Sequence, residues 1–275
     1  MTAAFPAPAW LVGCGNMAGA MVEGWRAGDV DFAGVTVIRP SGTPIEGVRT
    51  ITDYPDEQPR FVMLGFKPQK LDEIAPALAQ HIGGQTILVS MLAGVTAATL
   101  RDRFPKARAV VRIMPNLPVA QVQGVVAIYS ADGDQDELAD VRQLMASLGM
   151  IAWCETEDEL GVIGAVAAAG VAYVARFGEA LAKSGEALGL RPILARMVAE
   201  QTLIGTSAFA AATGSHMTEI ARKVASPKGT TEQGLAVLDA ADGLQQLVDR
   251  TLEAAIRRSQ ELAAAAAIDP PDPLA

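Results

Sequence analysis

The sequence is poor in the residue types that build metal centres and disulfide frameworks. It contains two cysteines and two histidines among 275 residues. Cys14, Cys154, His81 and His216 lack the spacing of a zinc site or of a disulfide-rich fold. We therefore expect no metal, and reduced thiols in the cytoplasm. The first residues, MTAAFPAPA, include no basic residue and no long apolar core, so we expect no secretory signal.

Basic residues and long apolar runs are scarce as well. Lys and Arg total 22 against 31 Asp and Glu, for a net charge of -9. This balance argues against a nucleic-acid partner, because phosphate binding depends on a surplus of Lys and Arg. The uncharged apolar run at residues 161–175 is shorter than the ~20 residues that a membrane span needs and is rich in Gly and Ala. It predicts a buried helix and no membrane partner.

What is present is ample material for a packed core. Half of the residues are hydrophobic, and 19% are charged. A chain of 275 residues exceeds one typical domain, which favours two domains. No Ser-His-Asp set and no well-placed carboxylate pair stands out, so any chemistry is expected to come from a bound cofactor.

One stretch near the N-terminus suggests which cofactor. WLVGCGNMAGAMVEGW, residues 10–25, is an apolar run that breaks into glycines and then becomes amphipathic. Gly13, Gly15 and Ala18 form the pattern G-x-G-x-x-A, in which small residues permit a tight turn, a close ligand and close helix packing. The helix expected from Asn16 offers free N–H groups to a pyrophosphate. An ordinary turn between a strand and a helix also explains the motif, but the strand-helix units that follow favour a dinucleotide.

The order of the expected elements divides the chain in two. Over residues 1–155 apolar and β-branched runs alternate with helical patterns, which predicts a doubly wound, mostly parallel α/β domain. The expected strands are 35–38, 61–66, 86–92, 109–114, 125–129 and 150–154, and the expected helices 68–82, 95–104 and 134–148. From 156 to 268 only helical periodicity is found, interrupted near 189–192, 213–215, 226–229 and 242–243. Residues 269–275 are rich in proline and predict a loose tail.

The end of the second expected strand bears on the choice of cofactor. NAD-preferring folds place an Asp or Glu there, roughly 20 residues after the glycines, whereas a basic residue accommodates a 2′-phosphate. Here Arg39 and Ser41 follow the strand, and no acid precedes Glu46. We therefore expect NADP(H) to be preferred over NAD(H), although a solvated arginine at a strand end is a common alternative.

A second candidate site is the loop 226–231, with the sequence SPKGTT. A glycine followed by hydroxyl residues at the start of a helix exposes N–H donors that suit a carboxylate. The alternative is an ordinary helix start in which Thr230 or Thr231 is the N-cap.

Several stretches together resemble the pyrroline-5-carboxylate reductase family over nearly the whole chain. They are VGCGNMAGAMVEGW (12–25), LGFKPQ (64–69), SMLAGVT (90–96), VRIMPNLPV (111–119), EDEL (157–160), GVAY (170–173) and ASPKGTTEQGL (225–235). The resemblance implies an α/β Rossmann domain over 1–155 and an all-helical dimerisation and substrate-binding domain over 156–268. It implies a cofactor on Gly13, Cys14, Gly15, Asn16, Met17, Arg39, Ser41, Gly65, Phe66, Lys67, Met91, Leu92, Ala93 and Asn116. A substrate carboxylate would then lie on Gly229, Thr230 and Thr231.

The sequence also departs from the usual family pattern. Before GVAY the family commonly has T-x-x-S-G-S-G-P-A-Y, whereas this chain has Gly164, Ala167, Ala169 and Val171 at the Thr, Ser, Ser and Pro positions. Lys228 replaces the first glycine of S-P-G-G-T-T, and Lys223 stands where Asn is common. The missing hydroxyls are the family's candidates for proton delivery, and their absence leaves no general acid that we can name.

The resemblance implies the NADPH-dependent reduction of 1-pyrroline-5-carboxylate to L-proline by a cytoplasmic homodimer. Two alternatives remain open at this point. The first is a divergent relative that reduces a bulkier or less polar cyclic imine. The second is a catalytically silent protein that binds dinucleotides.

Overall fold

The computed structural model describes residues 3–267, which form two compact units. The first unit contains residues up to 169 together with the segment from 255, and the second contains 170–254. The expected tail at 269–275 lies outside the described residues. The domain boundary at 155/156, inferred from the end of the strand pattern, stays a prediction about how the chain is divided functionally.

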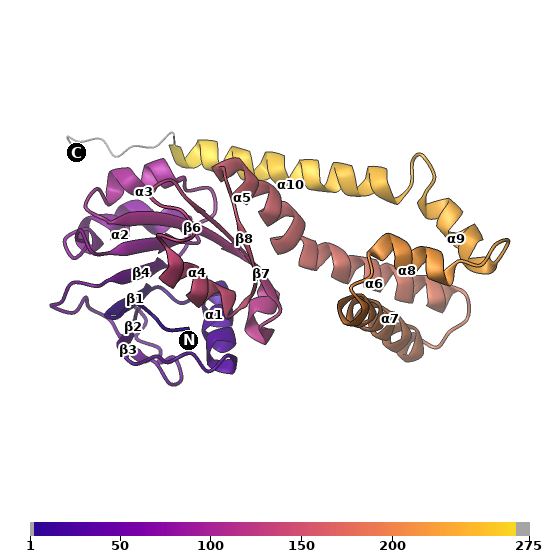
Figure 1. Ribbon diagram of the computed structural model, residues 1–275, viewed down its shortest axis with the longest axis horizontal. Coiled ribbons are helices and arrows are strands. Elements are labelled where there is room, and N and C mark those ends of the chain that lie inside the picture. The colour runs from indigo at the N-terminus through magenta and orange to yellow at the C-terminus, as the bar shows by residue number, and fades with distance from the viewer. Residues whose placement is uncertain (1–2, 268–275) are drawn as a thin grey trace. The chain divides into compact units, whose positions relative to one another are not determined.

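The first unit is built on an eight-stranded sheet in the order β3-β2-β1-β4-β5-β6-β7-β8 (Figure 1). All neighbouring strands are parallel except β6 and β7. The strands are β1 (Ala9–Val12), β2 (Val35–Ile38), β3 (Arg49–Ile51), β4 (Phe61–Leu64), β5 (Ile87–Ser90), β6 (Ala109–Pro115), β7 (Gly124–Ser130) and β8 (Gly149–Trp153). The prediction of a doubly wound, mostly parallel sheet is confirmed.

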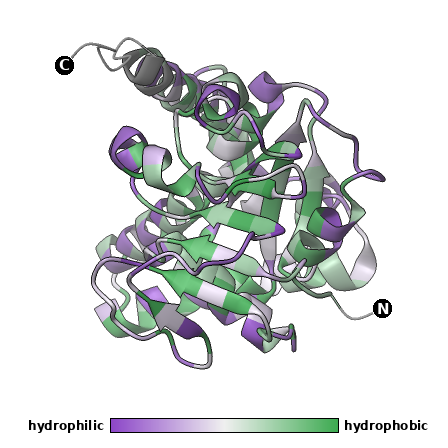
Figure 2. Ribbon diagram, turned by 90° about the vertical axis from the view of Figure 1, so that its left-hand side faces the viewer, coloured by the Kyte–Doolittle hydropathy of each residue, from purple (hydrophilic) through white to green (hydrophobic). Residues whose placement is uncertain are grey.

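Helices cover both faces of this sheet. One face packs against α1 (Asn16–Ala27), the 3-10 helix η2 (Leu117–Gln121) and α4 (Ala139–Ala146), and the other against α2 (Leu71–Leu78) and α3 (Ala97–Arg103). A 3-10 turn, η1 (Pro68–Lys70), leads into α2. Strands covered on both faces are apolar throughout, and Figure 2 shows the sheet as a continuous hydrophobic layer. β1, β2, β4 and β5 are buried at every position.

Some elements differ from the expectation. The edge strand β3 is missed because its sequence, RTI, is short and half polar. The helix expected over 134–148 begins only at Ala139, because the Asp134 carboxylate accepts the N–H groups of Asp136 and Glu137 and holds a turn. The N-terminal part of the first unit, up to residue 169, ends with α5 (Glu157–Ile163) and a π-helical turn, η3 (Gly164–Ala168).

The second unit is entirely helical. It contains α6 (Gly170–Ala187), α7 (Pro192–Thr213), α8 (Met217–Val224), α9 (Thr230–Leu238) and the first part of α10 (Leu244–Ala267). The four expected breaks fall between these helices, where glycines and a proline end or start them. One prediction is wrong: the run 161–175 is not buried, because within it only Ala165 is buried in the single chain.

Candidate functional site

The carboxyl ends of four neighbouring strands place the predicted cofactor residues in one row. In the parallel register Val12 pairs with both Ile38 and Leu64, and Leu64 pairs with Ser90. The residues that follow these strand ends, Gly13, Arg39, Gly65 and Met91, therefore lie along the same edge of the sheet. The strand order reverses between β1 and β4, and open α/β sheets bind ligands at such a switch point.

The glycines at this edge have different physical roles. Gly13 has φ +80, and a Cβ there would stand 3.0 Å from the Gly65 backbone. A Cβ on Gly65 would stand 2.9 Å from the Gly13 carbonyl oxygen, so the two strand ends approach as only glycines permit. A Cβ on Gly15, by contrast, would meet no atom nearer than 3.9 Å. The space in front of Gly15 is therefore an open cradle that a ligand can enter.

The start of α1 faces this cradle with unused donors. Gly15 is the N-cap, with no side-chain cap, and the Gly19 N–H makes a 2.8 Å bond to its carbonyl. The N–H groups of Asn16, Met17 and Ala18 consequently have no partner within the helix. The first turn carries no acidic residue. A helix N-terminus of this kind stabilises an anion, so the turn fits a dinucleotide pyrophosphate.

Arg39 adds a positive charge beside the turn. Burial raises the pKa of the Cys14 thiol, while the Arg39 guanidinium acts on the same pKa in the opposite direction. Within residues 3–267, Arg39 makes no ion pair or side-chain hydrogen bond. Glu46, the first acid after the strand, pairs instead with Arg26, with 3.7 Å between Nη1 and Oε2. The Ser41 hydroxyl accepts the Thr43 N–H at 3.3 Å.

The other residues predicted to line the cofactor path differ in exposure. Lys67 and Ala93 are exposed, whereas Phe66 and Met91 are half-buried against the two sides of the core. Leu92 is 2% exposed, and its side chain belongs to the core. Its N–H donates to the Ser90 hydroxyl at 3.2 Å. The Leu92 side chain thus supports the loop from within the core, and its contact with a cofactor stays a prediction.

The predicted substrate loop lies in the second unit and has an unusual backbone. Lys228 adopts φ +62, a left-handed conformation that costs a residue with a Cβ about 1 kcal/mol and explains the glycine common there in the family. Its N–H donates to the Glu232 carboxylate at 2.7 Å. The Gly229 N–H donates to the Ser226 carbonyl at 2.9 Å, and the expected contact of Gly229 with a substrate carboxylate stays a prediction.

The alternative interpretation of this loop, with Thr230 or Thr231 as the N-cap, is wrong. The N-cap of α9 is Gly229, and no side chain caps the helix. In the part of the chain that the structure describes, the Thr230 and Thr231 hydroxyls accept and donate no hydrogen bond. The N–H groups of Thr230 and Thr231 lie in the first turn of α9, where they have no helical partner. Both hydroxyls and these two N–H groups therefore remain available to an anion.

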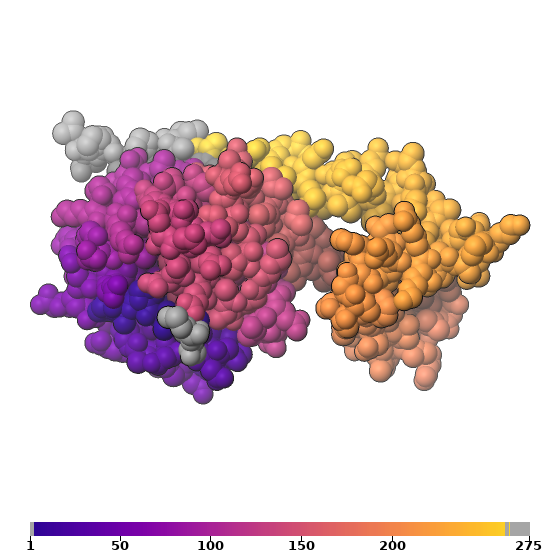
Figure 3. All heavy atoms as spheres, in the orientation of Figure 1, coloured from indigo at the N-terminus to yellow at the C-terminus, as the bar shows by residue number. Residues whose placement is uncertain are grey.

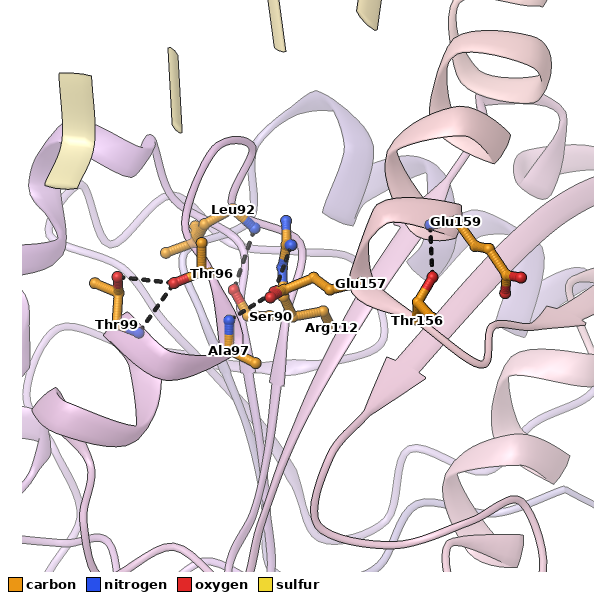
Figure 4. A network of polar contacts seen from close by, with 9 residues as sticks. All are labelled: Ser90, Leu92, Thr96, Ala97, Thr99, Arg112, Thr156, Glu157 and Glu159. Atoms are coloured by element: carbon orange, nitrogen blue, oxygen red, sulfur yellow. Dashed lines mark hydrogen bonds and ion pairs between the residues drawn. The ribbon is translucent and has the colours of Figure 1, made fainter. Parts of the chain in front are cut away.

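A partly buried ionic network was missed by the sequence analysis (Figure 4). The Glu157 carboxylate oxygen Oε1 accepts the Ala97 N–H at the start of α3 and pairs with Arg112 Nη1 of β6, both at 2.7 Å. The Arg112 side chain is 11% exposed and that of Glu157 29% exposed. The signal was present: one arginine within the otherwise apolar strand AVVRIMP needs a partner. The network fastens α5 to the sheet, beside a pocket lined by Gly94, Thr96 and Met114.

The polar groups described so far suit a nucleotide cofactor rather than a metal. Within residues 3–267, no group of three His, Cys, Asp or Glu side chains could hold a metal ion. The doubly wound sheet, the open cradle at Gly15 and the free α1 donors define a dinucleotide-binding protein of the Rossmann class.

Comparison with known proteins identifies the family. The model of pyrroline-5-carboxylate reductase dimerisation matches residues 157–262. Pyrroline-5-carboxylate reductase of Pseudomonas aeruginosa is 31% identical over 262 residues, 92% of this chain and 96% of that protein. The chain belongs to the pyrroline-5-carboxylate reductase family.

Solved structures agree with this assignment. A pyrroline-5-carboxylate reductase from Coxiella burnetii has a TM-score of 0.84 and 28% identity, covering 94% of this chain and 99% of that one. The Plasmodium falciparum pyrroline carboxylate reductase, whose structure has NADP bound, shares the fold with a TM-score of 0.79 and 19% identity, covering 93% and 97%. The fold expected from the resemblance is confirmed, with a mostly parallel sheet unit and a helical C-terminal part.

Proposed function

We propose that this chain reduces 1-pyrroline-5-carboxylate to L-proline with NADPH. The observation that carries the proposal is the open glycine cradle at the sheet's switch point in a member of this family. The reduced nicotinamide supplies a hydride when bound. The chain binds and orients the reactants: the N–H groups of α1 hold the pyrophosphate, and Thr230 and Thr231 hold the substrate carboxylate. A protonated imine needs no further acid from the protein.

The proposed preference for NADPH over NADH rests on charge. A 2′-phosphate beside Arg39 would form a charge-assisted contact with a guanidinium that no carboxylate neutralises. The ribose 2′-hydroxyl of NADH would find no carboxylate in the turn after β2, since Glu46 is held by Arg26.

We also propose that the functional unit is a homodimer formed through the helical part of the chain. α7 carries the exposed apolar residues Ile193, Met197 and Ile204, with 71, 57 and 62% of each exposed. The stretch 157–187 is long and apolar enough to cross a membrane by length and composition, which for a single helix is weak evidence. Its first turn holds three acids and its second half holds Arg176, Glu179 and Lys183, which suits a protein interface in the cytoplasm better than lipid.

One observation favours a second candidate function, the reduction of a bulkier and less polar imine. The segment 164–171 has no hydroxyl, and a Cβ on Gly164 would stand 3.2 Å from the Met114 side chain. The environment on this side of the first unit is thus apolar where the family usually has Ser and Thr.

Turnover of NADPH against a panel of cyclic imines tests these functions. The panel should contain 1-pyrroline-5-carboxylate, its six-membered homologue and uncharged 1-pyrrolines with and without a bulky substituent. We expect the highest kcat/KM for 1-pyrroline-5-carboxylate. A bulky uncharged imine that reacts tenfold better would favour the second candidate. NADPH binding without turnover of any imine would identify a silent dinucleotide-binding protein.

A further inference from the structure

Asn116 makes a set of buried hydrogen bonds that the family resemblance did not indicate. It follows β6 directly and is 6% exposed. Its side-chain Oδ1 accepts the Val125 N–H of β7 at 2.8 Å, and its Nδ2 donates to the Ala167 carbonyl of η3 at 3.1 Å. Because an N–H can only donate and a carbonyl can only accept, these two partners fix the orientation of the amide.

The Asn116 backbone is engaged as well. Its N–H donates to the Val125 carbonyl at 3.2 Å, and its own carbonyl accepts the Val119 N–H at 3.1 Å. One residue thus ties together β7, the turn η2 and the π-helical turn η3. A buried amide with this set of partners leaves little for a cofactor to contact.

The segment that Asn116 holds is itself irregular. The Ala169 N–H bonds to the Gly164 carbonyl at 3.0 Å, five residues back, and this wider ring is the mark of a π-helical turn. Such turns are rare and occur frequently at functional sites. Residues 164–169 also cover the positions where the family usually carries its hydroxyls, and here they are glycine and alanine. With no polar side chains of its own, the segment depends on Asn116 for a polar anchor to the sheet.

We propose that Asn116 is a positioning residue that sets the place of residues 164–169 beside the reacting edge of the sheet. It acts on the substrate side of the reaction, through the Ala167 carbonyl, and does not contact the cofactor. The inference rests on the proposed function, because it assigns a role in imine reduction.

The variant Asn116→Asp tests the role with little change of volume. The carboxylate keeps an acceptor for Val125 but sets an oxygen against the Ala167 carbonyl, which releases η3. We expect the KM for the imine to rise, or kcat/KM to fall, by about tenfold, since one buried hydrogen bond is lost. The NADPH dissociation constant should stay within about twofold. Hydrogen exchange should become faster in peptides that cover 164–169.

Thr86→Val is the matched control. The Thr86 hydroxyl is fully buried at the opposite end of the sheet, where it donates to the Pro59 carbonyl at 2.6 Å and accepts the Gly83 N–H at 3.2 Å. This isosteric change also removes buried hydrogen bonds from the first unit. It should lower the melting temperature while leaving the imine KM and the exchange of 164–169 unchanged.

The outcomes separate the possibilities. A tenfold loss of NADPH affinity in Asn116→Asp with an unchanged imine KM would show a direct cofactor contact and overturn the proposal. So would equal kinetic losses in both variants, or unchanged exchange of 164–169. If the wild type reduces no imine, the proposed function fails, and the exchange experiment still decides whether Asn116 holds η3. Should Asn116→Asp not fold, the smaller and uncharged Asn116→Ser takes its place in the same comparison.

Discussion

The two units of the chain bury their apolar residues to very different degrees. In the first, whole strands are buried, and Trp10, Trp25 and Phe61 are fully enclosed. In the second, the buried residues are all small: Gly178, Ala182, Ala195 and Ala199. Many of its larger apolar side chains are exposed, among them Leu188 at 88% and Val237 at 72%. The helices α7 to α9, which lie in the orange part of the colour range in Figure 3, contribute many of them.

The two units are therefore stabilised in different ways. A sheet covered on both faces encloses its own core, whereas helices that meet through alanine and glycine come close together and leave their large side chains outside. Exposed apolar surface on this scale marks a site of association. The first unit therefore forms its hydrophobic core within a single chain, whereas the second is expected to bury its large apolar side chains against a partner.

The largest effect is expected from a charge placed on the exposed face of the second unit. Ile193, Met197 and Ile204 share one face of α7 at spacings of four and seven residues, and Met197 is 57% exposed. If this face is buried in a dimer, replacing Met197 by glutamate removes about 1.5–3 kcal/mol of hydrophobic binding free energy in each protomer, so twice per dimer by symmetry. It also buries a charged carboxylate. Met197→Glu should raise the dimer dissociation constant at least about 100-fold, as measured by analytical ultracentrifugation.

Met150→Glu offers the control for this change. Met150 of β8 is equally apolar and 64% exposed but belongs to the first unit. Met150→Glu should therefore leave the dimer dissociation constant unchanged. The assignment of the interface to the second unit would be wrong if both variants weakened the dimer equally, or if the wild type were monomeric at micromolar concentration.

The next effect concerns the ionic network that closes the first unit. Glu157→Ala removes the partner of both Arg112 and the Ala97 N–H. We expect the free energy of unfolding, measured with urea, to fall by about 2–3 kcal/mol. This is less than the ~3–5 kcal/mol typical of a broken, fully buried pair, because the Glu157 side chain is 29% exposed. In the second unit, Glu179→Ala breaks a fully solvated pair with Arg176 and Lys183 and should leave stability unchanged. Equal stability of the two variants would refute the difference.

Cofactor recognition should map to the first unit alone. Arg39→Ala removes the only cation that we assign to the 2′-phosphate, and a charge-assisted bond contributes about 1.5–3 kcal/mol. The NADPH dissociation constant should rise roughly ten- to a hundredfold, whereas that of NADH serves as internal control and should stay the same. Calorimetric titration with both cofactors checks this. An unchanged preference in the variant would refute the assignment of Arg39.

Substrate recognition should map to the second unit. Thr231→Ala removes a hydroxyl that could bond to the substrate carboxylate, so kcat/KM should fall by about ten- to a hundredfold with the NADPH dissociation constant nearly unchanged. Because Gly229 and not Thr231 caps α9, the melting temperature should not change either. A destabilised variant with normal kcat/KM would remove the substrate site from this loop.

Most of the helices and strands, and their order along the chain, follow from local sequence patterns. Apolar runs of the right length become parallel strands because both faces are covered. Gly189 and Gly214 follow α6 and α7 with positive φ, which glycine adopts without strain. Pro192 begins α7 because its fixed φ suits the first helical position. G-x-G-x-x-A likewise predicted the tight turn after β1, where Gly13 approaches Gly65 at a distance that excludes a Cβ.

Which polar groups already have hydrogen-bond partners could be seen only in the tertiary structure. Arg112 and Glu157 are 45 residues apart, and no local pattern announces that pairing. The Asn116 amide bonds to Val125 and Ala167, and no sequence motif indicates these partners. Thr230 and Thr231 were possible caps until the fold gave that position to Gly229. Periodicity and steric limits act over a few residues and are legible in the sequence, whereas hydrogen bonds between distant segments depend on how the chain packs.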